Sequence, residues 1–196
     1  MSESFLFLAE GFEEIEALTA VDVLRRAGIP LKTVSITSAL QVTGAHGVTV
    51  TADVLFDNTL FHSASWLILP GGMPGATNLY NCAQLQGLLR RQAESPKGKI
   101  AAICAAPAVV LGQMGLLKGH RATCYPGFEE LLAGAKVVSD PVVADGKYVL
   151  GNGPANALNW AIAIVKEEKG TNVATQVANG MLRYPKPNAD LGNYFG

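Results

Sequence analysis

The stretch Lys99–Val110 constrains the fold most, because a short apolar run ends in a cysteine and a helix start follows at once. Ile100–Ile103 has the length and hydrophobicity of a strand buried on both faces. Pro107 suits a first helical turn, where its missing N–H has no intrahelical partner. Cys104 then lies at a sharp strand-to-helix turn with small residues two places away on either side. The sequence therefore predicts a nucleophile elbow.

Such a turn would expose the sulfur and direct free N–H groups of the following helix at it. The positive end of a helix dipole favours thiolate over thiol. The alternative is a small buried cysteine that packs as a hydrophobe, as free cysteines often do. This stretch alone does not decide between the two interpretations.

Length and composition fit one α/β domain, residues 1–182, followed by an irregular tail at 183–196. Hydrophobic residues make up 49% of the 196 residues and charged residues only 16%, which fits a sheet covered on both faces. The net charge of −1 gives no basic footprint, so we predict no nucleic-acid partner. The longest uncharged run, 100–117, is broken by proline and glycine, so we predict no membrane contact.

The cysteines and histidines indicate free thiols and no zinc site. The three cysteines are an odd, sparse set that predicts free thiols in a reducing cytoplasm, and the N-terminus lacks the positive region of a signal peptide. His46, His62 and His120 lie far apart with no metal-ligand spacing. We therefore expect no zinc site.

The apolar pattern predicts a mainly parallel sheet. Strands are expected at 4–9, 31–37, 65–69 and 100–103, short strands at 48–51 (at the sheet edge) and 121–125, and helices from Glu13 to Gly28, at 83–94, after Gly151 and after Thr171. The first strand–helix–strand unit requires a parallel pair. In its helix, we expect the core face to hold Ile15, Leu18, Val21 and Leu24. The Asp145-Gly146 turn predicts a small antiparallel hairpin.

Three features fall at the carboxyl ends of predicted strands, where α/β sheets bind ligands: an acidic turn, two glycines and the cysteine. A cysteine nucleophile needs a lowered pKa or a proton partner, and we select Glu16 for that role. Backbone N–H groups of Gly72 and Ala105 could stabilise an oxyanion. The alternatives are a solvated acidic helix start and, for Gly71-Gly72, ordinary turn chemistry.

Five motifs occur in a fixed order: Glu13-Glu-Ile-Glu16, Asp22–Gly28, Leu69–Gly72, Ala101–Pro107 and Gly153-Pro154. Together they resemble the ThiJ/PfpI superfamily, most closely its parkinsonism-associated deglycase (glyoxalase III-like) subfamily, over nearly the whole chain. The resemblance implies a flavodoxin-like three-layer α/β/α sandwich that forms a homodimer, with a reactive cysteine at the elbow.

The resemblance also implies roles for individual residues. Glu16 takes the place of the protonated glutamate that hydrogen-bonds the thiolate, and Gly71 and Gly72 take the place of backbone donors. Asp22 and Arg26 lie where relatives build the dimer contact, although their i,i+4 spacing would equally make an intrahelical pair.

Three residues are expected to line the pocket: Tyr125, His46 and Pro154. The first two depart from the family pattern. Tyr125 stands where many relatives carry a histidine near the cysteine, and His46 stands where relatives have an arginine lining the pocket. A Cys–His pair of the kind found in peptidases and amidotransferases is therefore in doubt.

The resemblance implies a cysteine-dependent glyoxalase or deglycase that acts on glyoxal, methylglyoxal or their early adducts on proteins and needs neither a metal nor an organic cofactor. The expected partners are a small reactive carbonyl or a glycated protein, and a second copy of the chain. The alternative is a non-enzymatic redox sensor or chaperone in the oxidative stress response, because a poised thiol oxidises first. A cysteine peptidase or amidotransferase-like hydrolase is the least favoured, because no histidine has motif support as its base.

Overall fold

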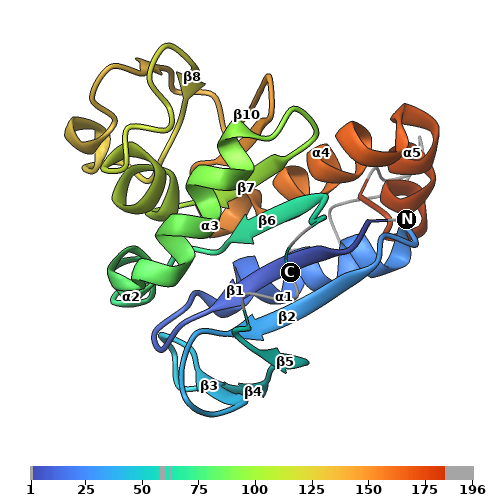
Figure 1. Cartoon of the computed structure of the whole chain (residues 1–196). Helices are drawn as coiled ribbons and strands as arrows, with labels where there is room; N and C mark the ends of the chain where they lie inside the picture. Colours follow the sequence, from blue (N-terminus) through green and yellow to red (C-terminus); the bar gives the residue numbers. More distant parts are fainter. Residues whose placement is uncertain (1, 58–60, 62, 184–196) are drawn as a thin grey trace, which may run out of the picture.

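A computed structural model describes residues 2–57, 61 and 63–183 (Figure 1). Within these residues the main sheet has seven strands in the order β10-β11-β7-β6-β1-β2-β5. Their bounds are β1 Ser4–Leu8, β2 Leu31–Ser35, β5 Val54–Leu55, β6 Trp66–Leu69, β7 Lys99–Ile103, β10 Val142–Asp145 and β11 Tyr148–Gly151. Neighbouring strands run parallel except β10, which pairs antiparallel with β11. The predicted fold class, a mainly parallel α/β/α sandwich with an antiparallel hairpin, is confirmed.

Helices cover both faces of the sheet (Figure 1). They are α1 Glu14–Arg26, α2 Gly75–Asn81, α3 Ala83–Glu94, α4 Ala157–Lys169 and α5 Thr171–Gly180. Side chains alternate across β1, so Phe5 and Phe7 belong to the core beneath α3, while Leu6 and Leu8 belong to the core beneath α1 and α4. This two-sided burial explains the continuous apolar runs in the sequence.

The predicted buried face of α1 is confirmed for Leu24, which is fully buried, and for Val21, which packs partly buried against the core, but it was wrong for Ile15 and Leu18. Ile15 is 57% exposed and Leu18 is 43% exposed. The core face of α1 instead holds four small or branched residues and one acid: Glu16, Ala17, Ala20, Val23 and Leu24. Alanines let α1 approach α4 and the sheet closely, and the large apolar residues on the adjacent face remain at the surface.

Several short elements also differ from the prediction. Strand β4 (Thr49–Thr51) pairs with β3 (Gln41–Thr43) in a separate two-stranded sheet, and the edge of the main sheet is β5. Strand β8 covers only Arg121–Ala122 and pairs with β9 (Lys136–Val137). The helix after the cysteine, Pro107–Gly112, has the wide turns of a π-helix.

Residues 184–196 of the expected tail lie outside the described residues. In the part of the chain that is described, no helix is both long and apolar enough to cross a bilayer.

Candidate active site

Cys104 follows β7 directly and adopts a left-handed backbone conformation with φ of 64°. Such a conformation costs a non-glycine residue about 1–3 kcal/mol and persists only where the surroundings enforce it. Here the Cys104 N–H donates to the Gly151 carbonyl at 2.9 Å, and the Cys104 carbonyl accepts from the Tyr125 N–H at 2.8 Å. The sharp turn is therefore held from both sides by backbone hydrogen bonds.

The sulfur lies in a tight environment rather than on an open surface. Cys104 is only 9% exposed, so the expectation that the elbow would expose the sulfur needs correction. The backbone N–H groups of Gly72 and Ala105 donate to the thiol. One donor comes from the loop after β6 and the other from the start of the following helix.

Glu16 is completely buried beside this cysteine. Its Oε2 accepts a hydrogen bond of 2.7 Å from the Gly71 N–H. The carboxyl group also interacts with the Cys104 thiol, yet Oε1 has no partner of standard hydrogen-bond geometry among the described groups. A buried oxygen without a donor favours the protonated acid, because an unpaired buried charge is costly.

Gly71 makes the contact between cysteine and glutamate sterically possible. A Cβ atom at this position would lie 2.6 Å from the Cys104 Cβ and 2.9 Å from the Glu16 Oε2. Any side chain at position 71 would therefore separate the sulfur from the carboxyl group.

Burial is the main cause of a raised pKa at both Glu16 and Cys104. Burial raises the pKa of Glu16 to about 7, against the hydrogen bonds from Gly71 and Cys104 and with a smaller contribution from the charge of Glu13. Burial, followed by the charge of Glu16, raises the pKa of Cys104 to about 12. The expected lowering of the thiol pKa by the helix dipole is therefore overridden. Two acids in contact cannot both ionise easily, so the thiolate requires that Glu16 carry the proton.

Two of the expected pocket-lining residues, Tyr125 and Pro154, and the two expected dimer-contact residues, Asp22 and Arg26, lie in the segments that follow β8 and β11 and on the surface of α1. Tyr125 anchors the elbow through its N–H, and its half-exposed ring stands near Phe128. Pro154 begins a short helical turn before α4. Asp22 and Arg26 form an intrahelical ion pair of 2.7 Å on the exposed face of α1.

His46 does not contact the cysteine; it belongs to a cluster that the sequence did not predict. Glu14 is buried, and its Oε1 accepts the backbone N–H of His46 at 2.7 Å, while its Oε2 lies 2.9 Å from the imidazole Nδ1. Gly44 leaves room for this carboxylate, because a Cβ there would overlap Glu14. The contact joins residues 32 positions apart, and the only sequence signal for it was the glycine-flanked turn.

Glu13, Glu14 and His46 bring three potential ligand atoms within 4.8 Å of one another. Because the imidazole nitrogen already shares a hydrogen bond with Glu14, we describe the three as an ion-pair cluster. Elsewhere in the described chain, His120 pairs with Asp145 at 3.4 Å. His62 lies outside the described residues.

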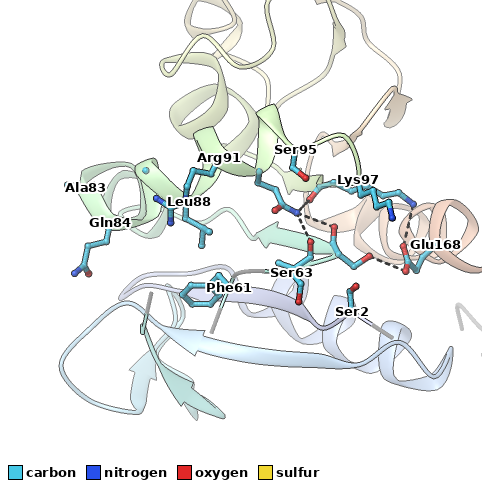
Figure 2. Close-up of a pocket in the computed structure, with 15 residues that line it drawn as sticks. Ser2, Phe61, Ser63, Ala83, Gln84, Leu88, Arg91, Ser95, Lys97 and Glu168 are labelled. Atoms are coloured by element: carbon cyan, nitrogen blue, oxygen red, sulfur yellow. Dashed lines mark hydrogen bonds and ion pairs between the residues drawn. The ribbon is translucent and has the colours of Figure 1, made fainter. Parts of the chain in front are cut away.

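The cavity shown in Figure 2, about 1020 Å³, lies at the opposite end of the sheet, near the amino ends of β6 and β7. The Glu168 carboxylate in this cavity already accepts hydrogen bonds from the side chains of Ser65, Trp66 and Lys99. The cavity contains none of the predicted site residues, so its size does not make it the reaction site.

Comparison with known proteins gives consistent results. The DJ-1/PfpI family matches residues 4–167. Protein dj-1beta of Drosophila melanogaster is 37% identical over 185 residues, which cover 93% of this chain and 98% of that protein. The glutathione-independent glyoxalase DJR-1.2 of Caenorhabditis elegans is 32% identical over 86% of this chain and 89% of its own length. The chain spans only 41% of DJ-1 homolog B and 47% of DJ-1 homolog A of Arabidopsis thaliana.

Solved structures agree with this result. The structure of oxidized Toxoplasma gondii DJ-1 superimposes with a TM-score of 0.88 at 32% identity, covering 93% of this chain and 98% of that one. The family match over most of the chain, together with these relatives, shows that the chain belongs to the DJ-1/PfpI family.

Proposed function

We propose that this protein is a cofactor-independent glyoxalase or deglycase in which Cys104 is the nucleophile and Glu16 is the proton carrier. The observation that carries the proposal is the buried Glu16 carboxyl group beside a cysteine held at a φ of 64°. The name of the C. elegans relative, a glutathione-independent glyoxalase, supports the same reaction class. The substrates we propose are glyoxal, methylglyoxal and their early adducts on proteins.

The proposed reaction needs a group that gives and takes protons beside the sulfur, and Glu16 fills that role. The Cys104 thiolate attacks the aldehyde carbon, and the Glu16 carboxylic acid protonates the resulting oxyanion to give a hemithioacetal. The Glu16 carboxylate then removes the proton from the former aldehyde carbon, which gives an enediol thioether. Return of that proton to the neighbouring carbon, together with transfer of the hydroxyl proton from the first oxygen to the second, gives a 2-hydroxy thioester. Water hydrolyses the thioester, its proton returns to Glu16 and the Cys104 thiolate leaves, so methylglyoxal and water become lactate and one released proton.

The pKa of about 7 suits Glu16 to this work, because a general acid–base group is most effective near the operating pH. The N–H groups of Gly72 and Ala105 lie at the sulfur, where they stabilise the thiolate that leaves in the last step. The small exposed fraction of Cys104 favours short aldehydes over polypeptide carbonyls.

The test measures lactate formation from methylglyoxal without glutathione. We expect Cys104→Ser to abolish turnover and Glu16→Gln to reduce it by about 10²-fold or more, the range of a lost general acid–base. Cys82→Ser and Cys124→Ser are matched controls that should retain activity. Undiminished turnover by Cys104→Ser would exclude the proposal.

Redox sensing is a second candidate, favoured by the oxidized state named for the Toxoplasma relative. A Cys104 sulfinate would be faced by the N–H groups of Gly72 and Ala105 and by the Glu16 carboxyl group. We expect mass spectrometry after graded peroxide to find two added oxygens at Cys104 before any at Cys82 or Cys124. Equal oxidation of all three cysteines would argue against a sensor.

We also propose that two copies associate through α1 and the β3–β4 hairpin. This region exposes three large apolar residues, Ile15, Leu18 and Val48. We expect sedimentation velocity to find a dimer that Leu18→Lys dissociates. Val137→Lys, at an exposed apolar position elsewhere, is the control, and a monomeric parent protein would refute this assembly.

A further inference from the structure

The cavity of about 1020 Å³ at the amino ends of β6 and β7 carries an excess of positive charge (Figure 2). Its charged lining residues are three cations and one acid: Arg91, Lys97, Lys99 and Glu168. The Lys99 Nζ lies 3.3 Å from the Glu168 carboxylate, so these two charges offset each other. Arg91 and Lys97 are exposed, and the ion pairs within residues 2–57, 61 and 63–183 include neither of them. The cavity therefore holds two cations that no carboxylate of the described chain neutralises.

We propose that this cavity binds a soluble phosphorylated metabolite with at least two negative charges. A guanidinium group binds phosphate oxygens through two parallel hydrogen bonds, and an ammonium group binds them as a point charge, so Arg91 and Lys97 suit a doubly charged anion. The volume lies at the upper end of the range of small-molecule pockets, about 300–1,000 Å³, which leaves room for an organic group of nucleotide size beside the phosphates. The proposal rests on neither Cys104 nor the glyoxalase reaction.

Hydrogen bonds hold one wall of the cavity in place without a ligand. The buried Gln92 side chain donates from Nε2 to three backbone carbonyls at 3.1–3.2 Å, those of Ala64, Ser65 and Lys99. Glu168 accepts from the Ser65 hydroxyl at 3.1 Å and from the Lys99 Nζ at 3.3 Å. These bonds join α3 and α4 to the amino ends of β6 and β7 around the cavity. A ligand would therefore have to order only the two exposed cations, which keeps the entropic cost of binding small.

The surroundings of the cavity favour a soluble ligand over a phospholipid headgroup. A membrane-binding surface needs exposed apolar side chains or a cluster of about four to eight basic residues. The cavity offers three basic residues, of which one is already paired with Glu168. The large apolar side chains exposed on the described chain do not line it: Ile15, Leu18, Leu40, Val48, Leu55, Met73, Tyr125, Val137 and Leu182.

The experiment titrates the full chain with inorganic pyrophosphate in a calorimeter at constant ionic strength. We expect one pyrophosphate to bind per chain, and Arg91→Gln and Lys97→Gln each to weaken binding about five- to tenfold, because each removes a charge-assisted hydrogen bond to the anion. Arg90→Gln is the matched control. It removes an exposed cation from the neighbouring position of α3 that does not line the cavity, so its affinity should equal that of the parent.

A second pair of variants changes the charge of the cavity while both cations stay in place. Gly87 lies on α3 in the cavity lining, and a Cβ there would meet only the Arg91 Nη1, at an ordinary contact distance of 3.6 Å. Gly87→Glu places a carboxylate four residues before Arg91, where it should pair with the guanidinium and weaken pyrophosphate binding about tenfold. Gly87→Gln has the same size without the charge and should bind several-fold more tightly than Gly87→Glu.

Four outcomes would overturn the proposal. They are the absence of saturable binding up to about 10 mM pyrophosphate, an equal loss in Arg90→Gln, equal affinities of Gly87→Glu and Gly87→Gln, and binding to phosphatidylserine vesicles that Arg91→Gln abolishes while pyrophosphate does not bind. The last result would assign the cavity to a membrane surface.

The binding test is independent of the proposed reaction. Lactate formation by Arg91→Gln should equal that of the parent, because the cavity contains none of the residues placed at the reactive cysteine. Failure of the glyoxalase reaction would therefore leave the pyrophosphate titration intact.

Discussion

Replacing Glu16 by glutamine should remove a specific pH dependence of stability. A carboxyl group whose pKa is higher in the folded than in the unfolded state binds more protons when folded, so the free energy of unfolding falls as pH rises between the two values. Burial raises the pKa of Glu16 from 4.5 to about 7. Glu16→Gln has nearly the shape of the protonated acid, cannot ionise, and should not show this loss.

The magnitude follows from the two pKa values. The difference between 4.5 and about 7, at about 1.4 kcal/mol per pH unit, corresponds to a loss of about 3 kcal/mol in the parent protein. Nearly all of the loss should fall between pH 4.5 and pH 7.5. Above that range the difference between the two proteins should stay constant, because Glu16 is then ionised in both the folded and the unfolded parent chain.

Urea unfolding at half-unit intervals from pH 4.5 to pH 8.5 measures this effect as the difference between parent and variant. Other carboxyl groups titrate in both proteins and cancel from the difference. Glu94→Gln, at an exposed position on α3, should parallel the parent at every pH. If the parent and Glu16→Gln curves run parallel from pH 4.5 to pH 7.5, Glu16 ionises normally, and the inference that it holds a proton near neutrality is wrong.

Three further predictions test packing around the site and at the surface. Gly71→Ala should lower the free energy of unfolding by about 1–3 kcal/mol and slow iodoacetamide alkylation of Cys104 about tenfold. Gly180→Ala is the control, because a Cβ at position 180 meets no atom within 4 Å, and it should change neither quantity. Equal effects of the two variants would refute the close approach at Gly71. Trp160→Phe removes a buried hydrogen bond of 3.0 Å from Trp160 Nε1 to the Val149 carbonyl and should cost about 1–3 kcal/mol in urea unfolding. Asp22→Ala breaks only an exposed intrahelical pair, so a thermal-unfolding change well above about 0.5 kcal/mol would indicate a further contact.

The sequence predicted the strands better than the orientation of the helices. Ile100–Ile103 could be read directly because a parallel strand covered on both faces is apolar throughout. In α1, by contrast, two adjacent faces both carry apolar residues. The large residues Ile15 and Leu18 suggested the wrong one, because the hydrophobic pattern does not record how closely a helix must pack. Close packing selected Ala17 and Ala20 for the core.

The positions of the site residues were predictable, but their electrostatics were not. The carboxyl ends of β6 and β7 bring Gly71 and Cys104 together, as the parallel topology requires. The thiol pKa was predicted in the wrong direction because the helix-dipole rule considers only the residues that follow the cysteine. The thiol pKa is instead governed by burial and by the charge of Glu16, which lies 88 positions earlier in the sequence. Electrostatic effects between residues so far apart in sequence can be assigned only once the fold is known.

The loop after β6 links the two halves of the reactive pair through consecutive amides. The Gly71 N–H donates to the Glu16 carboxyl group, and the Gly72 N–H donates to the Cys104 sulfur. A carboxylate gains from the first donor and a thiolate from the second, so each amide offsets part of the cost that burial places on the negative charge of its partner. The protonation of Cys104 and Glu16 therefore depends on two glycines of the loop after β6 as well as on the elbow on which the cysteine lies.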